Sequence, residues 1–130
     1  MRGSRPPAVT ILAAVLGLEA LGMVAVTVLL IVELLAPGSH PYSVVSAVAL
    51  AVFAAIAALA IGLVALAMLR MAPWSRSAAI VWQIVQALVG VQAFSGAGAR
   101  PDLGVLLIAP AVVALVLLFR RDVAAATRRR

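Results

Sequence analysis

Four long apolar runs, separated by short polar segments, make up most of this chain. A helix of about 20 residues rises ~30 Å, which is the thickness of a bilayer's hydrocarbon core. The first two runs exceed that length, and the fourth, of 17 residues, is slightly short. The runs cover residues 8–35, 43–69, 77–94 and 103–119. This pattern predicts an all-α fold with four transmembrane helices in a single membrane domain.

The connecting segments are seven or eight residues long, and proline or glycine interrupts the helix in each of them. Short connections make consecutive helices antiparallel neighbours, so we expect an up-down-up-down four-helix bundle. All ten basic residues are arginines, and in this topology nine fall on one side and only Arg100 on the other. Because cytoplasmic loops are rich in Arg, both termini are predicted to be cytoplasmic. The sequence thus predicts a multi-pass protein of the plasma membrane.

Composition excludes an ordinary soluble domain, because 66% of the residues are hydrophobic, only 11% are charged and mean hydropathy is +1.24. The arginines lie at the ends of apolar runs, which favours contact with anionic lipid headgroups and gives no support to nucleic-acid binding. Residues 120–130 form a basic tail that we expect to extend the fourth helix a little into the cytoplasm. The predicted interface anchors are Trp74, Arg70, Arg76, Arg120 and Arg121.

Glu19 is the candidate intramembrane polar site, because it lies near the middle of the first run, where an ionisable group is costly. Low polarity disfavours the carboxylate, so we expect a protonated carboxyl that hydrogen-bonds a neighbouring helix. Counted from the cytoplasmic side, Gln86 in the third run lies at a similar depth, and Gln83 shares its helical face. The pair could be a structural clasp between helices, or Glu19 could be a functional carboxyl.

Candidate reaction chemistry is sparse. The chain has four acidic residues, one histidine and no cysteine, and it contains no phosphate-binding loop, catalytic triad or metal-ligand cluster. His40 stands alone between loop residues, and we assign it no role. We therefore expect a protein that is not an enzyme and that has no cofactor or metal.

Small residues recur at spacings of three and four along the second run, which predicts a helix that other helices can approach closely. This favours a non-enzymatic membrane protein that acts by helix association, as a homo-oligomer or within a larger membrane complex. The alternative is a small proton-coupled exporter of lipophilic cations that uses Glu19.

A basic, Trp-containing turn with Arg70, Trp74 and Arg76 leads into Ile-Val-Trp-Gln-Ile-Val-Gln at residues 80–86. In these features the chain resembles a group of small, uncharacterised four-span membrane proteins of actinobacteria. The resemblance implies a membrane protein without an assigned activity and transfers no catalytic residue. The membrane-embedded acid in the first span is also similar to that of small multidrug-resistance exporters, by analogy of fold and site.

Overall fold

The structure is a computed structural model and describes residues 5–38 and 43–128. His40 and three of the ten arginines (Arg2, Arg129 and Arg130) lie outside the described residues. Within the described ranges every regular element is an α-helix. These are α1 (Pro7–Leu35), α2 (Val44–Leu69), α3 (Pro73–Gln92), α4 (Pro101–Leu118) and the short α5 (Arg121–Ala126).

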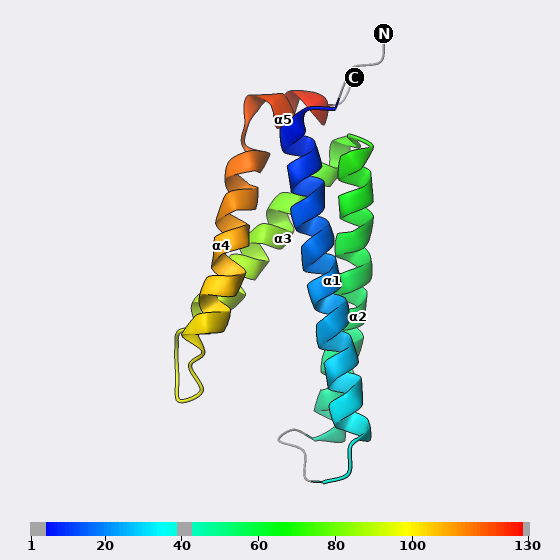
Figure 1. Ribbon diagram of the computed structural model, residues 1–130, viewed down its shortest axis with the longest axis vertical. Helices are drawn as coiled ribbons and strands as arrows, with labels where there is room; N and C mark the ends of the chain where they lie inside the picture. The colour runs from blue at the N-terminus through cyan, green and yellow to red at the C-terminus, as the bar shows by residue number, and fades with distance from the viewer. Residues whose placement is uncertain (1–4, 39–42, 129–130) are drawn as a thin grey trace.

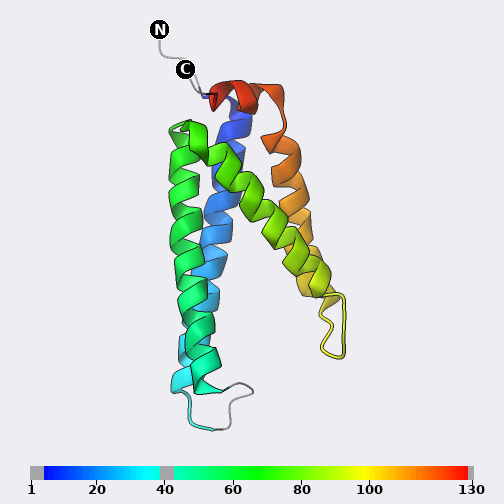
Figure 2. The ribbon, with the colours of Figure 1, turned by 180° about the vertical axis from the view of Figure 1, so that it is seen from behind.

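The four long helices form two antiparallel hairpins (Figures 1 and 2). In one hairpin α1 and α2 lie side by side along their whole length, and in the other α3 crosses behind α1 and returns as α4. The hairpins meet at the end that carries α5 and diverge toward the opposite end, which we call the distal end. All buried residues of α1 belong to its first half, between Ala8 and Leu16. The distal half of α1 therefore packs against α2 alone.

Three of the described helices are long and apolar enough to cross a membrane, namely α1, α2 and α4. This character is compatible with a multi-pass membrane protein. The helix expected as the third span, α3, has 20 residues but does not meet the same hydropathy criterion. Its sequence contains Arg76 and three glutamines, which lower its mean hydropathy. Two of those glutamines are buried inside the protein and are described below.

The basic turn before the third helix was predicted to be longer than it is. α3 begins at Pro73, so that Trp74 and Arg76 belong to its first turn, and α4 likewise begins at Pro101. Proline is well tolerated at the first helical position, because its missing N–H would have no partner there. Proline therefore starts these helices, whereas the sequence analysis treated Pro73 as a helix breaker. α4 also continues through Pro110.

The expected straight extension of the fourth helix is wrong. α4 ends at Leu118, and Arg120 has an extended backbone (φ −65°, ψ 144°) that reverses the chain into α5. α5 lies across the end of the hairpins (Figure 1), and Val123 on its inner side is fully buried. Residues 121–126 thus close the core and do not continue α4.

The core lies directly beneath α5. Its largest fully buried apolar side chains come from four helices and are Val9, Leu12, Leu16, Met68, Leu118 and Val123. On α2 the small residues predicted to receive another helix are largely buried, including Ala51, Ala54, Ala58 and Ala65. α1 covers this face of α2 within the same chain, so the small-residue pattern is used intramolecularly.

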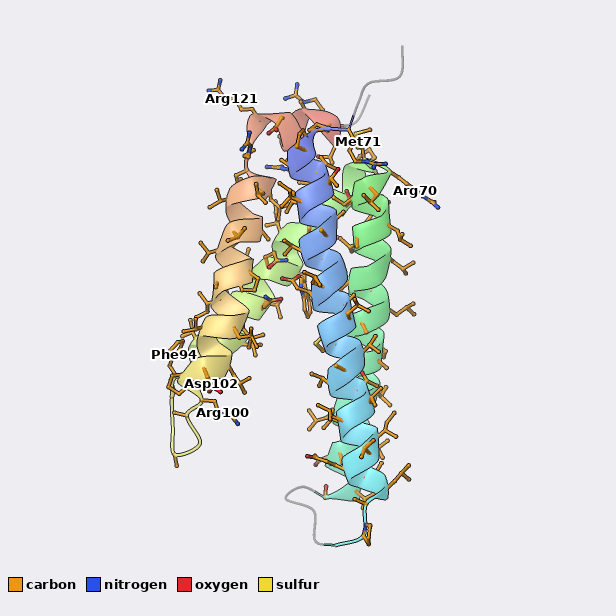
Figure 3. All side chains as sticks on the ribbon, viewed as in Figure 1. Arg70, Met71, Phe94, Arg100, Asp102 and Arg121 are labelled. Carbon is orange, nitrogen blue, oxygen red and sulfur yellow. The ribbon has the colours of Figure 1, made fainter. Side chains whose placement is uncertain are left out.

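The structure separates the arginines by end. Figure 3 shows Arg70 and Arg121 at the α5 end, whereas Arg100 lies beside Asp102 at the distal end of the second hairpin. Arg100 Nη2 and Asp102 Oδ2 are 3.0 Å apart in an exposed ion pair. The α5 end therefore carries the concentrated positive charge, and the distal arginine is paired with a carboxylate.

Candidate functional site

Glu19 lies where the first helix leaves the core. It follows Leu16 by three residues on the same face of α1, and the side chain is part-buried against α3. Beyond this position α1 has no buried residue. Glu19 therefore marks the boundary between the packed and the diverging parts of the two hairpins.

Two neighbouring residues of α3 donate hydrogen bonds to one oxygen of Glu19. Gln83 Nε2 donates to Glu19 Oε2 over 2.8 Å, and Trp82 Nε1 donates to the same atom over 3.1 Å. Gln83 is fully buried, so its amide has no access to water as an alternative partner. The contact joins α1 to α3 by side-chain hydrogen bonds, which is the arrangement expected of an interhelical clasp.

Glu19 and Gln83 each have a second side-chain oxygen without a hydrogen-bond partner. Within the part of the chain that the structure describes, Glu19 Oε1 and Gln83 Oε1 are buried and accept no hydrogen bond. A carboxyl group that carries a proton on Oε1 has one donor, and the amide oxygen of Gln83 is an acceptor. Protonation of Glu19 Oε1 would therefore supply a donor at a buried atom that otherwise has no partner, and the neutral carboxyl stays a prediction.

Gln86, the other predicted partner, also lies close to the Glu19 carboxyl, but its amide makes a hydrogen bond to α4. Its Nε2 donates to the backbone oxygen of Leu107 on α4 over 2.8 Å. Leu107 precedes Pro110 by three residues, and proline within a helix disturbs the hydrogen bonds of the preceding turn. Side chains of neighbouring helices commonly satisfy backbone groups at such positions in membranes. Gln83 and Gln86 therefore serve different contacts, one between the hairpins and one within the second hairpin.

The choice of Gln83 over Gln86 has a geometric reason. The depth comparison assumed that α1 and α3 begin at the same level, but Figure 2 shows α1 reaching further toward α5 than the start of α3. Glu19 consequently lies opposite a residue one turn earlier in α3. Trp82 was not predicted as a partner, although an indole N–H in an apolar span needs an acceptor and could have indicated one.

A cavity of about 420 Å³ lies next to this cluster, between α2 and α3 and bordered by α1. Its lining is almost entirely apolar and includes Leu16, Ile61, Val64, Val81 and Trp82. Trp82 belongs to the lining and also donates to the carboxyl, whereas Glu19 is not among the lining residues. The indole thus separates the carboxyl from the cavity.

The predicted interface anchors have distinct contacts. Arg76 Nε donates to the backbone oxygen of Leu118 over 2.8 Å, and its guanidinium lies 5.4 Å from the centroid of the Phe119 ring. Both contacts connect the start of α3 to the end of α4 and complement the negative end of the α4 dipole. Trp74 is half exposed, and Arg70 and Arg121 are exposed.

Arg120 is paired within its own turn, because Nε lies 3.1 Å from Asp122 Oδ1. Loss of hydration acts to raise the pKa of Asp122, but the hydrogen bond and charge of Arg120 outweigh it and hold that pKa below its ordinary value. The pair is exposed to solvent at the start of α5.

No group of three or more His, Cys, Asp or Glu that could hold a metal ion occurs among residues 5–38 and 43–128. Comparison with protein-family models, curated protein sequences and solved structures gave no match. The site must therefore be interpreted from its own geometry, in which the polar side chains within the long helices connect those helices.

Proposed function

We propose that this protein is a non-enzymatic, multi-pass membrane protein that acts by associating, through its diverging hairpins, with a second copy or with a larger membrane complex. The observation that carries the proposal is the one-ended packing of the two hairpins. They share a core beneath α5, they are clasped at Glu19, and they separate beyond it (Figures 1 and 2).

The exposed surface beyond the clasp supports this proposal. Val26 lies two turns beyond Glu19 on the same face of α1 and is 43% exposed, although this face points toward the second hairpin. Beyond Glu19 this face of α1 is not buried by the rest of the chain, so another helix can pack against it. Because helices in lipid associate through packing and interhelical hydrogen bonds, a protein neighbour can take the place of lipid on this face.

Crosslinking tests the association directly. The chain has no cysteine, so Val26→Cys introduces a unique thiol on the face toward the second hairpin. Val28→Cys, on the opposite face and 52% exposed, is the matched control. In native membranes we expect a crosslinked product from position 26 that is absent or much weaker from position 28. Equal products from both positions, or none from either, would contradict the proposal.

The topology is part of the same proposal: four spans in up-down-up-down order, with both termini in the cytoplasm and the protein in the plasma membrane. The arginines gathered at the α5 end support this orientation. α3 can serve as the third span because two of its three glutamines, Gln83 and Gln86, are buried, whereas its outer residues, such as Val81 and Leu88, are apolar and exposed. In intact cells an impermeant maleimide should label Gly98→Cys and spare Ala125→Cys, and the reverse pattern would overturn the orientation.

A second candidate function follows from the cavity beside Trp82. A small proton-coupled exporter of lipophilic cations could admit its substrate there, and displacement of the indole would expose the Glu19 carboxyl to it. Growth of an expressing strain on cationic dyes distinguishes the two functions. Resistance that is lost in Glu19→Gln would favour export, whereas equal growth of wild type, Glu19→Gln and an empty-vector strain would support association.

A further inference from the structure

A second cavity, of about 370 Å³, lies at the arginine-rich end, between the last turn of α2 and the first turn of α3. Apolar side chains of α2 form one wall, and Arg70 and Trp74 stand at the end nearest α5. Its complete lining is Leu63, Leu66, Ala67, Arg70, Ala72 and Trp74. None of these residues lines the cavity beside Trp82. We call this cavity the Arg70 pocket.

The turn that forms the Arg70 pocket is fixed by backbone hydrogen bonds. Met71 N donates to Met68 O and Ala72 N donates to Ala67 O, each over 2.9 Å, which is the Schellman arrangement at a helix C-terminus. Met71 has a left-handed backbone with φ 55°, as this motif requires. The position of Arg70 relative to α3 is therefore set by the fold.

Three other described arginines at this end have partners within the protein. Arg5 Nε donates to the backbone oxygen of Leu69 over 2.8 Å, Arg76 contacts the end of α4, and Arg120 is paired with Asp122. Arg70 is exposed and makes no ion pair among the described residues. Figure 3 shows it extending outward from the end of α2. Its guanidinium is thus placed to bind an external anion.

The apolar part of the pocket restricts what that anion can be. Leu63 and Leu66 are each 54% exposed. They belong to α2, which is long and apolar enough to span a membrane, and they line the part of the pocket that is further from α5. A guanidinium binds phosphate oxygens through several N–H donors, and tryptophan favours the headgroup level of a bilayer. A ligand that fills the pocket must therefore carry a phosphate and a hydrocarbon chain that continues toward the bilayer centre.

We propose that the Arg70 pocket binds one anionic phospholipid, with its phosphate at Arg70 and Trp74 and one acyl chain along Leu63 and Leu66. A headgroup without an ammonium group is favoured, because the surrounding arginines repel a second positive charge and the chain has a net charge of +6. This binding site is independent of the association proposed above.

Native mass spectrometry of the delipidated full chain, titrated with phosphatidylglycerol or with phosphatidylcholine of the same acyl chains, tests the site. We expect one tightly bound phosphatidylglycerol and weaker phosphatidylcholine binding. Arg70→Gln removes a charge-assisted hydrogen bond to the phosphate and should weaken phosphatidylglycerol binding about tenfold. Arg121→Gln removes an exposed arginine at the same end, outside the pocket, and should leave the affinity unchanged.

Brominated acyl chains supply a second measurement that needs no variant. Phosphatidylglycerol brominated in its chains should quench tryptophan fluorescence of the wild-type protein more strongly than brominated phosphatidylcholine, because Trp74 lines the pocket. Equal quenching by both lipids, or equal losses from Arg70→Gln and Arg121→Gln, would show a diffuse basic surface and overturn the proposal. Displacement of the lipid by equimolar inorganic phosphate would also overturn it, because the acyl chain would then contribute nothing.

Discussion

The clasp between Glu19 and α3 gives a quantitative prediction for interhelical bonding. Glu19→Leu removes the acceptor of two hydrogen bonds and leaves Trp82 Nε1 and Gln83 Nε2 without their partner. At ~0.6–1.7 kcal/mol for each interhelical bond, the free energy of unfolding should fall by about 1–3 kcal/mol. Glu19→Gln should be nearly silent, because an amide can accept from both donors and donate to Gln83 Oε1.

A double-mutant cycle isolates the contact. Gln83→Leu should cost ~0.6–1.7 kcal/mol, and the double variant with leucine at positions 19 and 83 should cost less than the sum of the single changes. The shared bond is lost only once in the double variant, and no polar group of the pair remains unpaired. Gln92→Leu is the control, since Gln92 is exposed at the end of α3 and should add independently to Glu19→Leu.

Reversible unfolding of the purified protein in mixed detergent micelles measures these free energies, and tryptophan fluorescence reports the environment of Trp82. Strict additivity of Glu19→Leu and Gln83→Leu would refute the clasp. A large loss of stability in Glu19→Gln would also refute it, because the geometry requires only hydrogen-bonding capacity at this position.

Two further predictions concern backbone positions. A Cβ at Gly104 would clash with the ring of Phe94, so Gly104→Ala should destabilise the α3–α4 hairpin by about 1–3 kcal/mol in the same unfolding assay. Gly62→Ala, where no atom lies within 4 Å of the added Cβ, should be neutral or stabilising. Met71 has φ 55°, so Met71→Gly should be more stable than Met71→Ala by ~1–2 kcal/mol, because glycine adopts a left-handed backbone without strain and alanine does not. At the exposed helical position Ala55 the order should reverse, with Ala55→Gly less stable than wild type by ~1 kcal/mol, and the same order at both positions would contradict the reasoning.

Sequence periodicity and length were sufficient to locate the long helices, because each apolar run is much longer than a turn and is bounded by proline or glycine. The helix starts were less accurate, since proline both ends and begins helices. For Pro73 and Pro101 the second role applies, and the sequence analysis used the first. The four-span topology stays a prediction, as does the resemblance to actinobacterial membrane proteins.

The candidate site was located only approximately from the sequence. The cost of an intramembrane acid singled out Glu19, and a shared helical face singled out Gln83 and Gln86. Which glutamine contacts Glu19 depends on the relative heights of α1 and α3, which tertiary packing determines and which counting along each helix cannot supply. The hydrogen bond from Gln86 to the turn before Pro110 could not be predicted for the same reason, because it forms only where α3 and α4 pack together.

The small-residue pattern of α2 was informative about packing and uninformative about the partner. Such a pattern indicates that another helix can pack closely against this surface, but that helix can belong to the same chain or to a different one. Here α1 takes that place. The association that we propose would therefore have to use surfaces other than the small-residue face of α2 that first suggested it.

The position of α5 has a consequence for how the protein matures. Val123 completes a core to which Val9 and Leu12 also belong, so residues from the two ends of the sequence are needed for one set of contacts. During synthesis the α1–α2 hairpin can form early from local contacts, whereas closure of this core waits until residues 121–126 have left the ribosome. Formation of the first hairpin and completion of the tertiary structure are thus separate events in time, and the arginine-rich end stays open during the interval between them.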